Sequence, residues 1–563
     1  MAATDRLEQE LLRVATELGA GDGIDVRLER PRNPEHGDLA SNLAMVLAGR
    51  LSRPPRAIAE DIRERLSLAG AGVSAVEIAG PGFLNFRLSQ DTQHDRLAEI
   101  LSAGEVYGRT ARGAGRKVQV EFVSANPTGP LHVAHARGAA LGDALASLLE
   151  WTGDEVQREY YVNDAGVQID RLAESLEARW RQLRGEEATL PEEGYRGEYV
   201  IDLARAVEAE MGAALVGMST EERRAALRDW AVPKLRQQHD DDLREFGVRF
   251  DEFFPESSIY ERGLIGDTLA ELHAKALVYE HEGALWMRTS DYGDDKDRVL
   301  VKSDGSYTYF LPDLAYHREK WRRGFEHVID VWGADHHGYV PRMKAALAAL
   351  GHADFLDVEI VQMVKIMREG REVRLSKRAG EIVTLRDLVR ETGVDVARYF
   401  FLMRRGDAQM IFDLDLALDQ SEKNPVYKIQ YAHARIASIF RKAGVEPAAV
   451  SRAPHVVALL TEPVEQDLIK QLARFPEAVA RAASNRSPHF LAEYLEETSG
   501  MINSWYHAGN PSRNPRLAVL VADPELRNAR LALAAGARIV LANGLRVLGI
   551  AAPERMQRAE EEE

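Results

Sequence analysis

The stretch that decides the fold is KVQVEFVSANPTGPLHVAHARGAALGDALASLLEWTGDEVQREYYV, residues 117–162. Its first part, KVQVEFV, alternates apolar and polar residues as β-strands do, and SANPTGP is rich in turn-forming residues. The residues that follow have the spacing of an amphipathic helix ending at Gly153, and EVQREYYV is a second β-run. A strand, a tight loop, a helix and a strand at this spacing predict a βαβ unit, hence a parallel sheet.

A second unit of the same kind lies downstream, where the β-run HVIDVWG (327–333) precedes the helical stretch GYVPRMKAALAAL (338–350). Strand character also recurs near 284–287 and 299–301. Between the two units, about 171–249, the chain is charged and helical with no strand pattern, which indicates an insertion. Two β–loop–α halves separated by an insertion predict an open α/β, Rossmann-like sheet that binds nucleotide at the carboxyl ends of its strands.

The flanking regions differ from this centre. Residues 1–116 combine helical periods with two short strands around the Pro81-Gly82 turn, which predicts a small α+β N-terminal domain. Residues 424–563 are almost purely helical and predict an all-α C-terminal bundle. We therefore expect a multidomain chain whose catalytic α/β domain covers 117–423.

Composition narrows the class of protein. The formal net charge of −17 argues against a protein that coats nucleic acid non-specifically. The absence of cysteine excludes disulfides, iron–sulfur clusters and thiolate zinc sites. No apolar run has the length of a membrane span, and the first residues lack the apolar core of a signal peptide, so we expect a cytoplasmic location with no membrane contact.

The first candidate chemical motif is the pair His132 and His135 at the start of the predicted helix. Side chains three residues apart can face the same ligand, and the helix N-terminus supplies backbone donors that suit a triphosphate. Pro127, Gly129 and Pro130 would shape the loop that brings backbone close to the nucleotide. An isolated pair of this kind is more often a helix start with two surface histidines. No HExxH pattern supports a metal pair.

The second candidate motif is REVRLSKRAG (371–380), which precedes the helical pattern TLRDLVRETG. Its Lys377 and Arg378 could neutralise negative charge as pyrophosphate leaves a nucleotide. A basic loop by itself is more often a solvated turn.

Taken together and in this order, the two motifs resemble the HIGH and KMSKS signatures of class I aminoacyl-tRNA synthetases. ANPTGPLHVAHAR is similar to the arginyl enzymes in particular. Further segments with the same resemblance are YYVNDAG (160–166), SYTYFLPDLAY (306–316), WGADHHGY (332–339), IQYAHARIASIFRKAG (429–444) and LGIAAPERM (548–556). The resemblance implies that the chain joins L-arginine to tRNA(Arg) through an arginyl-adenylate. It also implies that the chain uses ATP with Mg²⁺ and no zinc, and that it is a monomer.

The resemblance implies roles at the nucleotide. His132 and His135 would contact the ATP phosphates, and Lys377, at the second lysine of KMSKS, would stabilise pyrophosphate. Arg374 stands at the first lysine of that motif and keeps the charge while changing its geometry. Ala134 stands where the family usually has glycine, and its methyl group could crowd the nucleotide. The implied ATP-binding set is Pro127, Gly129, His132, His135, Met363, Val364, Ser376 and Lys377.

Recognition of arginine requires carboxylates, because a guanidinium is planar and permanently charged. The resemblance makes Glu121 and Asp313 the charge partners of the guanidinium, and Asn126 the partner of the α-amino and carboxyl end. Tyr309 would complete the pocket, with His337 (or its neighbour His336) on the far wall. Asp313 could instead cap the helix in which it stands.

The outer domains would bind tRNA. The resemblance places Phe83 and Asn85 at the tRNA corner, where an aromatic ring beside an amide can stack on an unpaired base. It places Tyr431, Arg435, Trp505 and Tyr506 near the anticodon loop. Phe83 could equally be a core residue of the small sheet, and Tyr431 and Trp505 could pack helices.

Two other classes remain open from sequence. A class I synthetase for another amino acid is disfavoured, because the Ile, Val and Leu enzymes need room for a large editing domain and the cysteine enzyme binds zinc through thiolates. A non-enzymatic RNA-binding relative is suggested only by Ala134.

Overall fold

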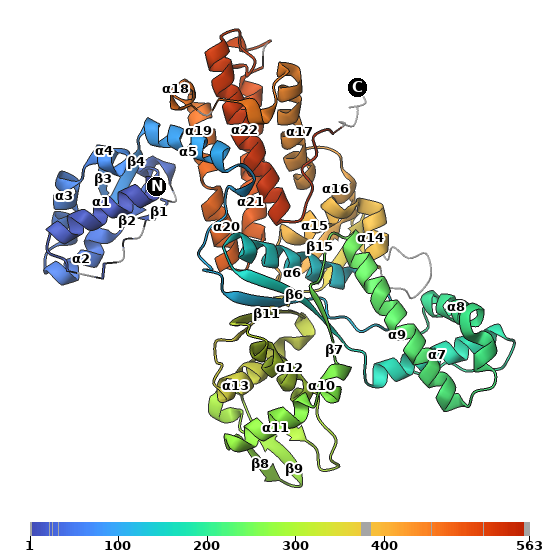
Figure 1. Cartoon of the computed structure of the whole chain (residues 1–563). Helices are drawn as coiled ribbons and strands as arrows, with labels where there is room; N and C mark the ends of the chain where they lie inside the picture. The colour runs from blue at the N-terminus through green and yellow to red at the C-terminus, as the bar shows by residue number, and fades with distance from the viewer. Residues whose placement is uncertain are drawn as a thin grey trace.

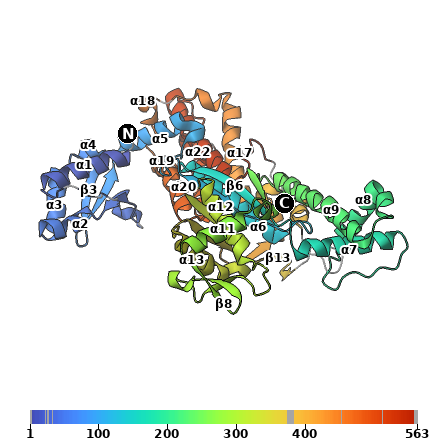
Figure 2. The same ribbon diagram turned by 60° about the horizontal axis from the view of Figure 1, so that its bottom comes forward.

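The structure is a computed structural model that describes residues 3–556 except 22, 25, 27, 32, 373–383, 452 and 511. A central sheet carries a helical bundle on one side and a smaller lobe on the other (Figure 1). The N-terminal module and a helical insertion project at opposite ends of this body, as the turned view in Figure 2 also shows. No helix in the described ranges has both the length and the apolar character needed to cross a membrane.

The central sheet confirms the predicted parallel α/β unit. Its strand order is β12-β11-β5-β6-β7, and every neighbouring pair is parallel. The bounds are β5 (Lys117–Glu121), β6 (Glu155–Val162), β7 (Glu252–Pro255), β11 (His327–Gly333) and β12 (Leu356–Val361). β5 lies between β11 and β6, where the chain order of the strands changes direction, and ligands of such sheets bind beyond the carboxyl ends of these strands.

Both faces of the sheet are covered. Successive residues of a strand point to opposite faces, and Val328 and Ile329 of β11 indeed belong to two different hydrophobic clusters. One cluster contains the first crossover helix α6 (Val133–Trp151), and the other contains α12 (Phe310–Arg322) and α13 (Val340–Leu350). Gly142 allows α6 to approach the sheet closely, because a Cβ at this position would lie 2.2 Å from the ring of Phe122.

The strands expected near 284–287 and 299–301 are confirmed, but they form a separate antiparallel sheet of order β10-β9-β8. This sheet belongs to the lower lobe in Figure 1. The elements of the lobe that precede α12 are α10 (Ser257–Glu261), α11 (Leu264–Ala274), β8 (Val278–His281), β9 (Ala284–Met287) and β10 (Arg298–Val301).

The helical insertion consists of three helices around their own core. They are α7 (Val167–Leu183), α8 (Glu198–Leu215) and α9 (Thr220–Glu245). Trp180, which is 1% exposed, lies in that core, and its indole N–H donates to Glu208.

The N-terminal module is an α+β domain with a four-stranded sheet of order β1-β2-β4-β3. Its hydrophobic core ends at Leu88, and the next helix is α5 (Gln90–Ala103). This helix packs against two C-terminal helices, α19 (Pro463–Ala473) and α22 (Pro524–Val547). The predicted boundary at residue 116 stays a prediction. The elements of the module are α1 (Ala3–Glu17), β1 (Leu28–Glu29), β2 (Leu39–Ser41), α2 (Leu43–Leu51), α3 (Pro55–Arg65), α4 (Leu68–Ala71), β3 (Val73–Ala79) and β4 (Phe83–Leu88).

The C-terminal part is helical, as expected. A connecting region comes first: β13 (Val364–Arg368), β14 (Arg371–Glu372), α14 (Leu385–Thr392), α15 (Val394–Leu402), β15 (Met410–Asp413) and α16 (Leu414–Leu418). The bundle then contains α17 (Pro425–Ala443), α18 (Pro454–Val457), α19 (Pro463–Ala473), α20 (Phe475–Ser484), α21 (His489–Ala508) and α22 (Pro524–Val547).

One buried arginine joins several of these parts. Arg398 of α15 has no exposed surface, and its guanidinium donates to Asp143 of α6, to the carbonyl of Phe246 after α9 and to the carbonyl of Leu548 after α22. Gly549 makes room for it, since a Cβ there would lie 2.1 Å from the guanidinium.

Candidate active site

The two histidines of the first motif lie together at the start of α6. Their rings stack with centroids 3.7 Å apart, and the His132 backbone N–H donates to Nδ1 of His135 at 3.3 Å. Nδ1 of His135 is therefore the acceptor, and its proton is on Nε2, free to donate to a ligand. Burial lowers the pKa of His132 and lowers that of His135 to about 3, so both rings are neutral at pH 7.

The loop that leads to these histidines is strained and externally supported. Val123 and Ser124 have positive φ angles of 68° and 39°, which non-glycine residues rarely adopt. Tyr199 of α8 donates to the carbonyl of Thr128 at 2.7 Å, and Nε2 of His239 in α9 lies 2.7 Å from the carbonyl of Gly129. The insertion therefore holds the loop that precedes the histidines, a role that the sequence did not indicate.

Most of the second motif lies outside the described residues, and the structure describes the chain again from Thr384. Arg374, Ser376, Lys377 and Arg378 lie outside the described residues. Thr384, which follows this segment, forms an antiparallel bridge with His132, and the N–H of Leu385 donates to the Leu131 carbonyl at 2.8 Å. The segment that follows the second motif, far from the first motif in sequence, thus contacts the start of α6.

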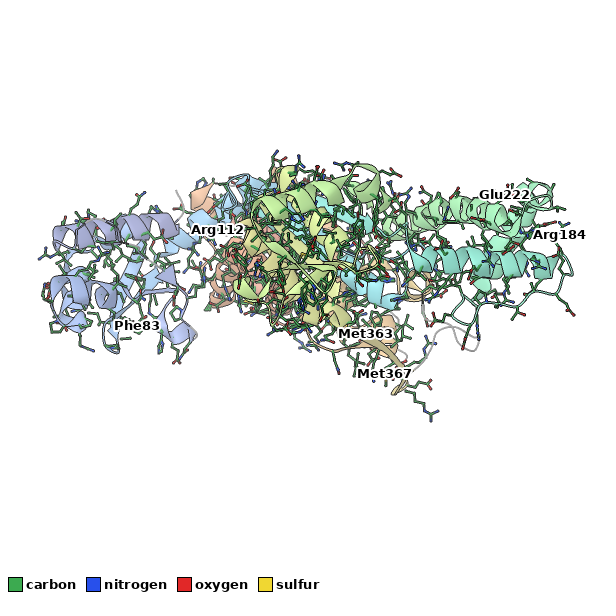
Figure 3. The ribbon with its side chains drawn as sticks, turned by 90° about the horizontal axis from the view of Figure 1, so that it is seen from below. Phe83, Arg112, Arg184, Glu222, Met363 and Met367 are labelled. Carbon is green, nitrogen blue, oxygen red and sulfur yellow. The ribbon has the colours of Figure 1, made fainter. Side chains whose placement is uncertain are left out.

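The residues predicted at the adenine lie near the same helix. Arg137 of α6 donates to the carbonyl of Gln362 at 2.8 Å and so holds the end of the segment that carries Met363 and Val364. Met363 is 67% exposed and Val364, which begins β13, is half-buried. In Figure 3, Met363 and Met367 are labelled close together at the lower edge of the molecule.

Glu121 ends β5 and takes part in a buried charge network. Its carboxylate accepts hydrogen bonds from Ser124 at 2.9 Å, Tyr316 at 2.9 Å and Lys320 at 2.6 Å. Burial raises the pKa of Glu121, and Lys320 opposes this rise. Lys320, which has no exposed surface, also donates to Asp330 at 3.0 Å. Burial alone would lower the pKa of Lys320, but Asp330 and Glu121 raise it.

The same network reaches Asp313. His317 contacts Asp330 through Nε2 at 2.8 Å and the Asp313 carboxylate through Nδ1 at 3.2 Å. Burial and Lys320 would lower the pKa of His317, but Asp313 and Asp330 raise it to about 10. His317 is therefore charged at pH 7. Asp313 is half-exposed in the first turn of α12, whose N-cap is Tyr309, so the capping alternative for Asp313 is wrong.

The network keeps an excess negative charge. Its carboxylates outnumber its cations by one, and the partly exposed carboxylate is that of Asp313. A site with uncompensated negative charge in a partly buried place favours a cationic ligand. The groups counted are Glu121, Glu159, Asp313 and Asp330 against Lys320, Arg323 and charged His317.

A further carboxylate, Glu256, was missed by sequence reasoning. It directly follows β7, and in the described part of the chain its side chain makes no hydrogen bond or ion pair. Burial, Asp164 and Asp313 raise its pKa to about 7. Burial also raises the pKa of Tyr161, and Glu256, Asp313 and Glu121 raise it further, so the charges of all three carboxylates act on this ring. A carboxylate directly after a strand could have been recognised as a candidate site residue. The strand β7 (EFFP, 252–255) was not predicted, so Glu256 was not recognised.

The other residues predicted at the arginine are more exposed. Asn126 donates to Gln168 of α7. Tyr309 is 88% exposed, and His337 is exposed in the 3-10 turn that follows β11. Tyr339, which ends this turn, is partly buried, and burial and the Asp313 carboxylate raise its pKa.

The predicted tRNA contacts divide into exposed and buried residues. Phe83 is 40% exposed on the N-terminal module (Figure 3), whereas Asn85 is 7% exposed. In the bundle, Tyr431 and Arg435 line a cavity of about 1220 Å³. The Arg435 guanidinium lies between the rings of Tyr431 and Tyr506, at 4.8 and 4.7 Å.

The prediction for Trp505 needs correction. Its side chain is 2% exposed in the hydrophobic core, so it packs helices in this structure and offers no surface for a base to stack on. Asn85 is also largely buried. Of the two residues predicted at the tRNA corner, Phe83 is the one that a base could reach.

The fold is an open parallel sheet with a stacked histidine pair at the start of its first crossover helix, and the segment after the second motif pairs with that helix start. These features are those of a class I aminoacyl-tRNA synthetase. Three family models match the chain: the arginyl tRNA synthetase N terminal domain at 3–88, the catalytic domain of class I tRNA synthetases (R) at 96–410, and the DALR anticodon binding domain at 429–556. The chain belongs to the arginyl-tRNA synthetase family.

Curated relatives agree along the whole length. The chain is 47% identical to arginine–tRNA ligase 1 of Halalkalibacterium halodurans, covering 94% of each chain. It is 49% identical to the arginine–tRNA ligase of Syntrophotalea carbinolica, covering 96% of each. The solved structure of Thermus thermophilus arginyl-tRNA synthetase matches 98% of this chain and all of its own, with 28% identity and a TM-score of 0.75.

The activity follows from this membership. The chain ligates L-arginine to its tRNA in two steps through arginyl-adenylate, consuming ATP and releasing AMP and pyrophosphate. The alternatives of another amino acid and of a non-enzymatic RNA-binding relative are set aside, because the matching relatives are arginine–tRNA ligases.

Proposed function

We propose that arginine binds at the carboxyl ends of β5, β6 and β7, with its guanidinium against Asp313 and Glu256. The observation that supports this proposal is the group of carboxylates around Tyr161, in a network with more negative than positive charges. Glu256 has no cation of its own in the described structure, and a guanidinium between it and Asp313 would lower the pKa of Glu256. The planar fork of the guanidinium suits two carboxylates on different sides.

Glu121 was expected to pair with the guanidinium of the substrate, but its carboxylate already has partners within the protein. Its two oxygens already accept three hydrogen bonds, one of them from the Lys320 ammonium. Its predicted contact with the guanidinium therefore stays a prediction, and we propose that it mainly shapes the pocket floor. Asn126, Tyr309 and His337 keep their predicted places around the substrate, with Asn126 toward the α-amino and carboxyl end.

At the nucleotide, the proposed donors are Nε2–H of His135 and the N-terminal amides of α6, next to the shaped turn at Pro127 and Gly129. His132 would lie beside the same phosphates. Met363 and Val364 would contact adenine through their backbone. Arg374, Ser376 and Lys377, carried over from the family motif, would act on pyrophosphate, and ATP would enter as its Mg²⁺ complex.

The chemistry would rest on positioning and electrostatics, without a covalent enzyme intermediate. The arginine carboxylate attacks the α-phosphate in line, and pyrophosphate leaves toward the second motif. The 2′-hydroxyl of the terminal tRNA adenosine then attacks the adenylate carbonyl and releases AMP. The desolvation free energy of a neutral imidazole is small, so little is lost when the triphosphate binds. The two rings are already in place to donate hydrogen bonds.

We propose the remaining assignments on the same basis. The domains would be 1–116 for the tRNA corner, 117–423 for catalysis and 424–563 for the anticodon loop. Phe83 would stack on an unpaired base, and Arg435 with Tyr431 would contact the anticodon loop at the large cavity. We further propose a monomer that works in the cytoplasm.

The decisive experiment measures aminoacylation kinetics of Asp313→Asn and Glu256→Gln. Each change removes a charge-assisted contact worth about 1.5–3 kcal/mol, so we expect the arginine KM to rise about tenfold to a hundredfold while the ATP KM stays unchanged. Glu280→Gln on β8 is the matched control, because it removes an exposed carboxylate of the lower lobe. An unchanged arginine KM in both pocket variants would show that the guanidinium binds elsewhere.

A further inference from the structure

A cavity of about 300 Å³ lies outside the active site, where α5 leaves the N-terminal module. One wall comes from α5 and the segment after it, and the opposite wall from the turn between α19 and α20. The polar residues that line it are Arg96, Glu99, Arg109, Thr110, Arg112 and Glu477.

Arg96 is a buried cation that lacks an acceptor. It is 9% exposed, and among the described residues it makes no hydrogen bond or ion pair. The acid that lines the cavity beside it, Glu477, is already bound to Arg30 of the N-terminal module through contacts of 2.6 and 3.2 Å. Burial lowers the pKa of Arg96, and Arg30 lowers it further. A buried charge without a partner is costly, so this guanidinium favours the binding of an anion.

A second donor in the same cavity also lacks a partner. The hydroxyl oxygen of Thr110 is buried and has no hydrogen bond. At the rim, Arg109 and Arg112 are exposed, and neither forms an ion pair in the part of the chain that is described. The Arg109 guanidinium lies over the ring of Trp151 at 5.0 Å, which fixes its position without neutralising it. Of the two carboxylates that line the cavity, Glu477 is already paired with Arg30 and Glu99 is exposed.

The position of the cavity indicates which anion it meets. The N-terminal module is tied to the bundle by Arg30–Glu477 and by Lys470–Asp38 at 3.0 Å, and Glu477 also lines the cavity, which therefore lies next to this junction. A tRNA that reaches both the outer domains and the active site must pass its backbone along this body. Phosphates bind guanidinium forks and hydroxyl donors without regard to base sequence.

We propose that this cavity, with Arg96 and Thr110 inside and Arg109 and Arg112 at its rim, binds a backbone phosphate of the tRNA. The site positions the tRNA relative to the N-terminal module and takes no part in the chemistry. It rests on the ligase activity, which supplies the tRNA, and it is independent of the arginine pocket proposed above.

The test measures the affinity of the full-length protein for tRNA(Arg) as a function of salt. For Arg96→Gln, and for the double variant Arg109→Gln with Arg112→Gln, we expect affinity about fivefold to tenfold lower at ~0.1 M salt. The slope of log K against log salt should become shallower by about 0.7–0.9 per lost contact. The tRNA KM should rise while kcat at saturating tRNA and the arginine KM stay unchanged. Arg184→Gln, at the opposite tip of the molecule (Figure 3), is the matched control and should leave affinity and slope unchanged.

The variants separate binding from folding. Arg96 is buried, so its variant needs an unfolding curve beside it, whereas the rim arginines are exposed and their double variant tests the proposal even if Arg96→Gln unfolds. An unchanged salt slope in the folded variants would overturn the proposal. Inorganic phosphate is the second probe: if it stabilises the native protein through Arg96 while tRNA affinity does not depend on these arginines, the cavity takes free phosphate and the assignment to tRNA is wrong. Failure of the arginine pocket would instead appear in the arginine KM with the salt slope intact.

Discussion

Replacing Gly142 by alanine should disturb the active site from within the core. The added Cβ would lie 2.2 Å from Cγ of Phe122 and 2.6 Å from its Cβ, whereas ordinary contacts are 3.4–4 Å. Phe122 has no exposed surface and packs on Phe250 with ring centroids 4.5 Å apart, so the ring has little room to turn away. The helix α6 must therefore move outward by about 1 Å, and overpacking of this kind costs about 1–3 kcal/mol.

That movement carries the histidine pair with it, because His132 and His135 stand at the start of the same helix. A misplacement of about 1 Å at a reacting centre can reduce a rate by about a hundredfold. We therefore expect Gly142→Ala to lower kcat for aminoacylation by about that factor, together with a lower Tm. Thermal unfolding and aminoacylation at saturating arginine, ATP and tRNA measure the two effects.

Gly138→Ala is the control, since it lies on α6 closer to the histidines and a Cβ there meets nothing within 4 Å. Alanine inside a helix gains about 0.5–1 kcal/mol over glycine, so this variant should be as stable as the native protein or more so, and fully active. If the two variants unfold at the same temperature and react at the same rate, the contact of α6 with Phe122 does not position the histidines.

Three further predictions concern the pocket and its supports. The pKa of Glu256 is raised to about 7, so its carboxyl gains charge as the pH rises from about 6 to about 8; the arginine KM should fall over this range, and Glu256→Gln should remove the dependence. A KM that varies equally in both proteins would assign the titration to another group. Lys320→Met leaves Glu121 and Asp330 buried without their cation and should cost about 3–5 kcal/mol of stability, measured by urea unfolding; a loss below about 1 kcal/mol would contradict the role of this cation. Tyr199→Phe removes the hydrogen bond to the nucleotide loop, worth about 1 kcal/mol, and should raise the ATP KM severalfold with tRNA affinity retained; equal loss of both would indicate a general defect.

The parts of the fold that sequence predicted are those with a local signature. The alternation in KVQVEFV, the turn residues of SANPTGP and the helical spacing after them all lie within one window, and the structure has β5, α6 and β6 there. The strand β7 is short and consists of EFFP, which has no alternation, so it was missed and Glu256 with it.

The electrostatics of the site could not be predicted in the same way. Lys320 meets Glu121 across a wide separation in sequence, and nothing near either residue indicates that both are buried and paired. Tyr199 and His239 lie on helices whose patterns show only an insertion, and their contacts with the loop depend on how those helices pack. Trp505 shows the converse: an aromatic residue on a helix does not reveal from sequence whether it faces solvent or the core.

The junction at Arg398 has a consequence for how the parts of this enzyme can move. One planar cation with fixed donor directions holds a side chain of α6 and the chain ends of the insertion and of the last bundle helix. Sliding any of these past the others breaks a bond to a group that has no water available to replace it. Arg398 therefore ties the last helix of the bundle directly to the helix that begins with the histidine pair, with a single side chain between them.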